Sequence, residues 1–423
     1  MMNGSTSLDE WIAHNSMDFD LASVDSLNEV IDRLIESLDE SVELLGFGEA
    51  LHGGKEILSL RNRFFERLVE KHNYSAIAIE SSFPKARAVN EYISGNSPMS
   101  YEELQTTGFS HGFGQLEENR ELIEWIKRHN AQSSSNRSVQ FYGFDAPTEM
   151  YSTDSPRGLL SFVLNFLASI DGKPRMEQQE RIDSLIGQDS DWEKLEALMD
   201  PSRSIGDSQA AMKLRMETED LILEMQARMP ELVARSSLES YFEAVHYARL
   251  ARQLLGYHSV MAKSRPDRIV RLMSIREAMM ASNLKYILSR QPEGGKVFLF
   301  AHNSHLQRGK ARWQLGADML EWWPVGSHLC ELLGPSYAAI GLGIVSSCSH
   351  AISEPESGTL EAMLSCARGQ GRLLPTGLGK GLSPKDVSAL CMRSRSTKNS
   401  TYFPLSSRSL ADFDWLAVLR EIK

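Results

Sequence analysis

The chain is poor in cysteine and lacks several short signatures of common enzyme classes. Its 423 residues include four cysteines, no two of which form a C-x-x-C pair. A structural zinc site is therefore not expected, and a reducing cytoplasm is the simplest setting. There is no Walker A loop, no G-x-G-x-x-G after a strand and no H-E-x-x-H. These absences disfavour a P-loop nucleotide-binding protein, a dinucleotide-dependent enzyme and a zinc metalloprotease.

Positive charge and long apolar runs are also scarce. Lys and Arg number 45 against 56 Asp and Glu, a net charge of −11, which argues against a nucleic-acid or anionic-membrane partner. The longest membrane-like stretch, residues 158–170, is too short to span a bilayer, and the first residues are too polar for a secretory signal. With 42% apolar and 24% charged residues, the composition is that of an ordered globular protein in the cytoplasm.

The first part of the chain alternates between strand and helix patterns. Short apolar runs that predict buried strands are separated by segments with apolar residues at helical spacing. This alternation predicts βαβ units, and hence an α/β fold with a mostly parallel sheet and flanking helices. The predicted strands are 42–48, 75–80 and 139–144, and the predicted helices are 27–38, 57–69, 84–93 and 117–129.

The middle of the chain predicts helices without strands. Strand patterns return at 296–301, 337–344 and 415–419, so the sheet is expected to be interrupted by a large helical insertion. We expect an N-terminal α/β part of a catalytic domain at 1–156, the insertion at 157–290, and a C-terminal α/β part at 291–423 that completes the domain. The helices predicted within the insertion are 177–198, 209–228, 231–257 and 268–289.

Ionisable residues stand at the carboxyl ends of four predicted strands. They are Glu49, Glu80, Asp145 and His302. Ligands bind open α/β sheets at this edge, so the pattern predicts one shared site, although strand ends are often polar for other reasons.

The segment after the first of these strands has the residues for acid–base chemistry. Its glycines permit a tight turn that would expose Glu49 and His52. A carboxylate can fix the tautomer of a neighbouring histidine and so prepare it as a general base. Arg61, in the following helix, could bind a carboxylate or developing negative charge. The alternative for His52 is a solvated loop residue.

A second cluster follows the strand at 296–301. His302 and His305 lie three residues apart and, with Glu49, His52 and Glu80, could form a set of metal ligands. Because H-x-x-H spacing is common by chance, the residues alone leave two possibilities open. Water is activated either by histidine or by a bound metal.

Taken together, these motifs resemble the erythromycin esterase family. The order and spacing are similar from about residue 41 to 150 and from 296 to 345, and the two histidine motifs are specific only in combination. The residues that carry the resemblance are Gly48-Glu49-x-x-His52-Gly53 with Glu56 and Arg61, Ile79-Glu80, Tyr142-Gly143-Phe144-Asp145, and Ala301-His302-Asn303-x-His305.

The resemblance implies hydrolysis of a macrolide lactone, or another bulky small-molecule ester, with no cofactor and no required metal. It implies that His52 activates water, that Glu49 and Glu80 position it, and that Arg61 and His302 polarise the carbonyl. His305 would support them. The predicted substrate-binding positions are His305, Asp145, Glu56 and His111.

One loop departs from the family pattern and leaves the substrate open. His111 lies in residues 108–114, where the family usually carries a Trp-containing aromatic stretch. Two other functions remain possible. The same site could catalyse a different acyl-transfer or elimination step on a biosynthetic intermediate, or the chain could be a metal- or haem-binding protein of related fold. The oligomeric state is not predicted.

Overall fold

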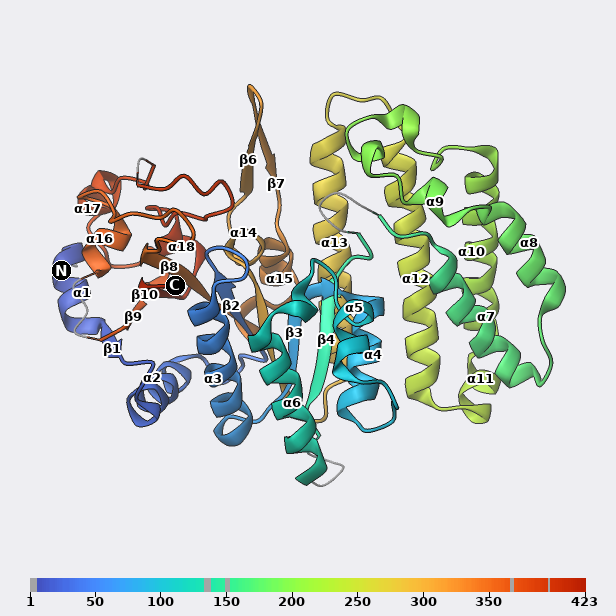
Figure 1. Ribbon diagram of the computed structural model, residues 1–423, viewed down its shortest axis with the longest axis horizontal. Coiled ribbons are helices and arrows are strands. Elements are labelled where there is room, and N and C mark those ends of the chain that lie inside the picture. Colours follow the sequence, from blue (N-terminus) through green and yellow to red (C-terminus); the bar gives the residue numbers. More distant parts are fainter. Residues whose placement is uncertain (1–5, 133–137, 149–152, 366–368, 395) are drawn as a thin grey trace. The chain divides into compact units, whose positions relative to one another are not determined.

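The computed structural model describes residues 6–132, 138–148, 153–365, 369–394 and 396–423. The chain divides into two compact units (Figure 1). The first comprises Met1–Glu80, Arg87–Tyr142 and Gln291–Lys423, and the second comprises Ser81–Ala86 and Gly143–Arg290.

The described residues form an eight-stranded sheet in the order β1-β9-β10-β8-β2-β5-β3-β4. Parallel pairs join β10 to β8, β8 to β2, β2 to β5 and β5 to β3, whereas β9 pairs antiparallel with both β1 and β10. The predicted α/β fold with a mostly parallel sheet is therefore confirmed. The strands are β1 (Met17–Phe19), β2 (Leu44–Glu49), β3 (Tyr74–Ser82), β4 (Gln140–Asp145), β5 (Lys296–His302), β8 (Tyr337–Ser346), β9 (Gly371–Pro375) and β10 (Trp415–Glu421).

Helices flank the sheet of the first unit, and α2, α3 and α6 run side by side (Figure 1). The apolar stripe of α3 is buried, and its Phe64 ring lies 4.9 Å from that of Phe47 in β2. A separate hairpin pairs β6 (Ala311–Leu315) with β7 (Asp318–Trp322). The α-helices outside residues 143–290 are α1 (Leu8–Asn15), α2 (Val24–Ser37), α3 (Lys55–Lys71), α4 (Phe83–Ile93), α5 (Tyr101–Thr107), α6 (Glu117–Gln132), α14 (Asn303–Leu306), α15 (Val325–Leu333), α16 (Leu360–Leu364), α17 (Pro384–Ala389) and α18 (Ser409–Asp412), among the described residues.

The second unit is a helical bundle. Its longest helix, α12 (Leu238–Met261), packs against α7 (Arg157–Asp171), α10 (Gln209–Ala227) and α13 (Arg268–Ser289). None of the described helices is both long and apolar enough to cross a membrane.

Two continuous helices predicted in the insertion are wrong. The segment 177–198 divides into α8 (Met176–Ile186), α9 (Asp189–Trp192) and a 3-10 turn, because Gly187 adopts a φ of 69° and ends α8. The segment 231–257 divides into α11 (Met229–Arg235) and α12. Here the Ser237 hydroxyl accepts a hydrogen bond from the Ser240 amide and starts a new helix.

The second unit also contains a buried ion pair in which both carboxylate oxygens accept hydrogen bonds. Arg276 donates from Nε to Oδ1 of Asp145 at 2.9 Å and from Nη2 to Oδ2 at 2.6 Å. The amide of Ala146 adds a third hydrogen bond, at 2.7 Å from Oδ1. Asp145 is completely buried, so these bonds replace the water that its charge would otherwise require.

Candidate active site

Three predicted site residues meet at the carboxyl edge of the first unit's sheet. Glu49 ends β2 directly opposite His302, which ends β5. Glu80 lies on the neighbouring β3, and its Oε2 accepts a hydrogen bond from the His302 amide at 2.9 Å. Parallel strand ends share one edge, which explains why residues so distant in the sequence come together.

His52 is held by Glu49 across a tight turn. Gly53 adopts a φ of 80°, which a residue with a side chain rarely takes, and Gly54 is the N-cap of α3. Nδ1 of His52 lies 2.5 Å from Oε1 of Glu49. Among the described residues only Glu49 hydrogen-bonds to the ring, so Nε2 remains available to a substrate or water. Glu49 is buried, whereas 37% of the His52 side chain is exposed.

The two carboxylates make His52 unusually basic. Burial by itself lowers the pKa of His52, but the charge and hydrogen bond of Glu49, assisted by Glu80, raise that pKa to about 9. Burial raises the pKa of Glu49 itself, and the charge of His52 opposes this. The His52 ring therefore carries both protons near neutral pH.

His302 has the opposite protonation state, although its ring lies 5.2 Å from that of His52. Burial, and next the charge of His52, lower the pKa of His302 to about 3. Its Nδ1 accepts from the Ser304 amide at 3.3 Å, so the neutral ring donates from Nε2 to the Thr401 carbonyl at 3.1 Å. Both ring nitrogens thus have partners within the chain.

His305 also contacts Glu80. It is buried, and its Nε2 lies 3.1 Å from Oε1 of Glu80. Glu80 therefore uses one carboxylate oxygen for the His302 backbone and the other for the His305 ring. This arrangement fixes the end of β5 and the start of α14 relative to β3.

Arg61 supplies a buried positive charge. Its Nε and Nη2 donate to Oδ1 of Asn62 at 3.0 and 2.6 Å, and its guanidinium lies 4.8 Å from the centre of the Phe300 ring. No carboxylate of the described residues lies within ion-pairing distance of it. Burial lowers the pKa of Arg61 to about 10, and Glu49 opposes this shift, so Arg61 is a cation at neutral pH.

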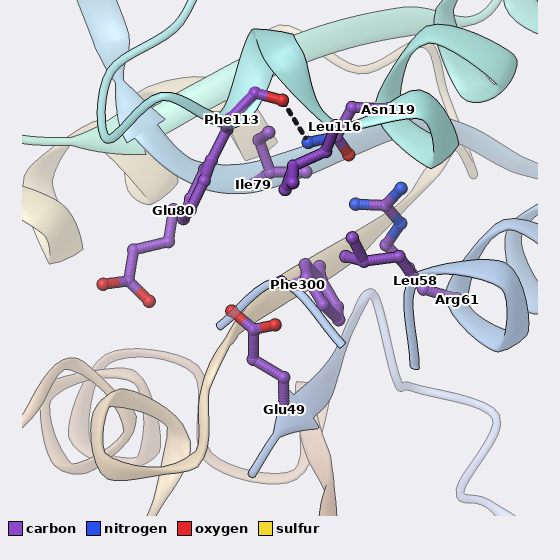
Figure 2. Close-up of a pocket in the computed structure, with 10 residues that line it drawn as sticks. Glu49, Leu58, Arg61, Ile79, Glu80, Phe113, Leu116, Asn119 and Phe300 are labelled. Carbon is purple, nitrogen blue, oxygen red and sulfur yellow. Dashed lines mark hydrogen bonds between the residues drawn. The ribbon is translucent and has the colours of Figure 1, made fainter. Parts of the chain in front are cut away.

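Of these residues, Glu49, Glu80 and Arg61 line a small pocket that is partly open to solvent (Figure 2), and His52, His302 and His305 are not among its lining residues. Arg61 and Asn119 lie on one side of it and Glu80 on the other. All of its lining residues belong to the first unit. They are Glu49, Gly53, Leu58, Arg61, Ile79, Glu80, Phe113, Leu116, Asn119 and Phe300.

The remaining predicted residues have different surroundings. Glu56 accepts a hydrogen bond from the amide of Lys423 at 3.1 Å and does not line the pocket. His111 packs on Phe113, with ring centres 5.5 Å apart, and the Phe113 ring lies 5.7 Å from that of His52. Asp145 belongs to the second unit, where it pairs with Arg276.

Sequence reasoning missed Leu116 and Asn119, whereas Phe113 belongs to the loop 108–114, which it expected to line the pocket. Phe113 begins a 3-10 turn (Phe113–Gln115), Leu116 follows that turn and Asn119 lies in the first turn of α6, and no motif marks the last two. Residues 108–112 also match G-x-S-x-G, but this segment lies between α5 and the 3-10 turn. A nucleophile elbow joins a strand to a helix and exposes its serine, whereas Ser110 is buried.

His302 and His305 raised the possibility of a metal site. The arrangement of the side chains that could bind a metal does not support it. No set of three or more His, Cys, Asp or Glu side chains in the described ranges is arranged to hold a metal ion. The bonds of His302 to Thr401 and Ser304 would have to break before either ring nitrogen could bind one.

An α/β protein with a histidine oriented by a carboxylate, and with a buried arginine in a pocket that the same carboxylate lines, has the components of a hydrolytic enzyme. The family model described as erythromycin esterase matches residues 69–422, so the chain belongs to the erythromycin esterase family. It is 24% identical to erythromycin esterase type I of Escherichia coli over 317 residues, which are 73% of this chain and 71% of that protein. Membership of the family supports classing the protein as a hydrolase.

Two solved structures show the same fold. A Bacillus cereus protein superimposes with a TM-score of 0.72 at 15% identity and covers 98% of this chain and 97% of its own. A mutant of the erythromycin esterase EreC in its open conformation gives a TM-score of 0.68 at 19% identity, with coverage of 96% and 98%. The family match includes Glu80, His302 and His305, whereas Glu49, His52 and Arg61 precede it.

Proposed function

We propose that the protein hydrolyses a carboxylic ester, with a macrolide lactone or an ester of similar bulk as substrate. The observation that carries this proposal is the Glu49–His52 pair, which leaves Nε2 of His52 available, while Glu49 lines the same pocket as the buried cation Arg61. The relationship to erythromycin esterase type I of Escherichia coli supports the macrolide as the first substrate to test.

The reaction begins with the fraction of His52 that is neutral. Nε2 removes a proton from water while the water oxygen attacks the ester carbonyl carbon. Glu49 holds Nδ1–H and stabilises the imidazolium that forms. The carbonyl oxygen gains negative charge, which Arg61 stabilises.

The second step breaks the bond between the carbonyl carbon and the alcohol oxygen. The proton held by His52 passes to that oxygen, and the products are a carboxylic acid and an alcohol. For a lactone both groups stay on one molecule, which gains one water. Glu80 holds the His302 backbone and the His305 ring and adds negative charge near His52.

A substrate panel tests the proposal. The purified protein is incubated with macrolides, smaller lactones and open-chain esters, and mass spectrometry reports the gain of one water. We expect hydrolysis of at least one bulky lactone and no change in rate with a chelator. If every ester stays intact, the proposal is wrong. If a chelator abolishes a rate that added metal restores, a bound metal ion activates the attacking water in place of His52.

A macrolide substrate has a cellular consequence that is also measurable. Expression of the wild-type gene in a macrolide-sensitive bacterium should raise the inhibitory concentration of that macrolide. Expression of His52→Ala should not. If both strains were equally sensitive, the protein would not confer resistance to that macrolide. Hydrolysis of another ester would still be compatible with this result.

A further inference from the structure

One acceptor in the pocket has no role in the proposed reaction. Asn119 is buried in the first turn of α6, and its Nδ2 donates to the Phe113 carbonyl at 2.8 Å. Its Oδ1 is buried and has no hydrogen-bond partner among the described residues. The bond to Phe113 fixes this orientation, because a flipped amide would place two oxygens together.

A buried acceptor without a donor is unfavourable unless a ligand or water supplies one. Asn119 lines the same pocket as Arg61, and both lie on the side opposite Glu80 (Figure 2). This side of the pocket therefore presents a cationic donor and a neutral acceptor together. A ligand that matches both carries an acceptor and a donor on neighbouring atoms.

The direction of the ester in the pocket follows from the proton transfers. His52 must return its proton to the alcohol oxygen, so the alcohol lies toward His52 and Glu49. With the carbonyl oxygen at Arg61, the acyl chain extends along Asn119, Leu58 and Leu116. The apolar walls suit its carbon atoms, and Asn119 is the polar exception.

We propose that Asn119 selects esters whose acyl group carries a hydroxyl on the second or third carbon. Its Oδ1 accepts the hydrogen bond of that hydroxyl while Arg61 binds the carbonyl oxygen. A protonated amine fits less well, because Asn119 has no charge to pair with it and Arg61 repels it. This inference rests on the proposed function and names its substrate class as 2- or 3-hydroxyacyl esters and lactones.

A binding experiment tests the selection without requiring turnover. The probes are N-benzylbutanamide and its 2-hydroxy and 3-hydroxy forms, which keep the carbonyl but replace the labile ester oxygen with nitrogen. Dissociation constants are measured by ligand-observed NMR. We expect the wild type to bind one hydroxylated probe about tenfold more tightly than N-benzylbutanamide, the typical effect of one satisfied buried acceptor.

Asn119→Leu replaces the amide with an apolar group of the same branching and the same number of non-hydrogen atoms, so the preference should fall to about one. Asn119→Ala serves as a second variant if the leucine form does not fold, as judged by circular dichroism. Leu116→Ala is the matched control. It changes an apolar wall of the same pocket and should weaken all three probes in parallel, with the preference intact.

Three outcomes overturn the selection by Asn119. The first is equal binding of the three probes by the wild type, which would mean that only water occupies the acceptor. The second is no binding of any probe at its solubility limit. The third is a preference that persists in the variants without Asn119. The substrate panel is independent of this readout. Failure of hydrolysis with the preference intact would reject the esterase proposal, and hydrolysis without the preference would reject only the role of Asn119.

Discussion

Glu49 and Asp145 are both buried carboxylates that follow strands, yet they belong to different kinds of site. Asp145 pairs with Arg276, a permanent cation that engages both of its oxygens. Glu49 pairs with His52, which can lose its charge and contacts one oxygen only, and Oε2 of Glu49 has no hydrogen-bond partner among the described residues. A carboxylate at a strand end is thus poised for chemistry when its partner can release a proton.

The comparison separates two uses of the same residue type. A saturated pair stabilises the fold, because removing either member leaves a buried charge. An unsaturated pair at an open pocket can exchange protons with a ligand. The variants below distinguish the two by what is lost, either catalysis with the fold intact or the fold itself.

Removing His52 should have the largest effect on catalysis. His52→Ala should lower kcat/KM on a substrate identified by the panel by about 10²–10⁴, the usual contribution of a positioned general base. Thermal unfolding should stay close to that of the wild type, because the ring is partly exposed and because Glu49, whose pKa is raised by burial, can take up a proton once its partner is gone. His14→Ala, at an exposed helix end, is the control and should keep full activity. Wild-type turnover in His52→Ala would remove His52 from the mechanism.

Removing Arg276 should mainly affect stability. Arg276→Met leaves Asp145 buried and uncompensated, and the free energy of unfolding should fall by about 3–5 kcal/mol. Urea denaturation measures this change. Arg252→Met, which breaks an exposed pair with Glu219 at 3.6 Å, should cost about 0–1 kcal/mol. Similar losses of unfolding free energy in both variants would show that the buried pair contributes no more to stability than the exposed pair.

Neutralising Glu80 should reduce activity less than removing His52. Glu80→Gln weakens the bonds to the His302 amide and the His305 ring, and we expect a loss of about 10–100-fold in kcat/KM. It also removes a negative charge that helps raise the pKa of His52, so the pH profile should shift to lower pH. An unchanged profile would place Glu80 outside the electrostatic environment of His52.

The pH profile of the wild type gives the mildest test. Because the pKa of His52 is raised to about 9, the neutral base becomes more abundant as the pH increases toward that value. kcat/KM should therefore rise from neutral pH and level off above about pH 9. Activity that falls over this range would mean that the imidazolium acts as an acid.

Much of the sheet and part of the site could be predicted because they depend on local patterns. Apolar runs located the parallel strands, and the rule that parallel strand ends share an edge brought Glu49 and His302 together. The short antiparallel strands β1 and β9 contain too few residues to give such a pattern. The split of the segment 231–257 depended on one serine cap within an otherwise continuous stripe.

Side-chain partnerships between distant elements could not be predicted. Arg276 lies 131 residues from Asp145, and no pattern in the sequence links them. Asn119 lies at the pocket because of the direction in which α6 leaves the 3-10 turn at Phe113, and no sequence pattern indicates that direction. The pKa of His52 depends on burial balanced against two carboxylates, and that balance requires the folded structure.

A last feature of the sheet concerns Gly48 and Asn303. The pairing of β2 with β8 extends only to Phe47 and Ile340. Beyond it, the Asn303 amide group exchanges two hydrogen bonds with the backbone of Leu342, at 2.7 and 3.0 Å. A Cβ at Gly48 would lie 2.0 Å from Oδ1 of Asn303.

Gly48 and Asn303 therefore constrain each other sterically. A lineage that replaced Asn303 with a smaller residue would lift the restriction on Gly48, whereas one that first gained a side chain at Gly48 would lose the bridge to Leu342. Relatives with a side chain at position 48 should therefore carry a smaller residue at position 303, even though neither residue takes part in the proposed chemistry.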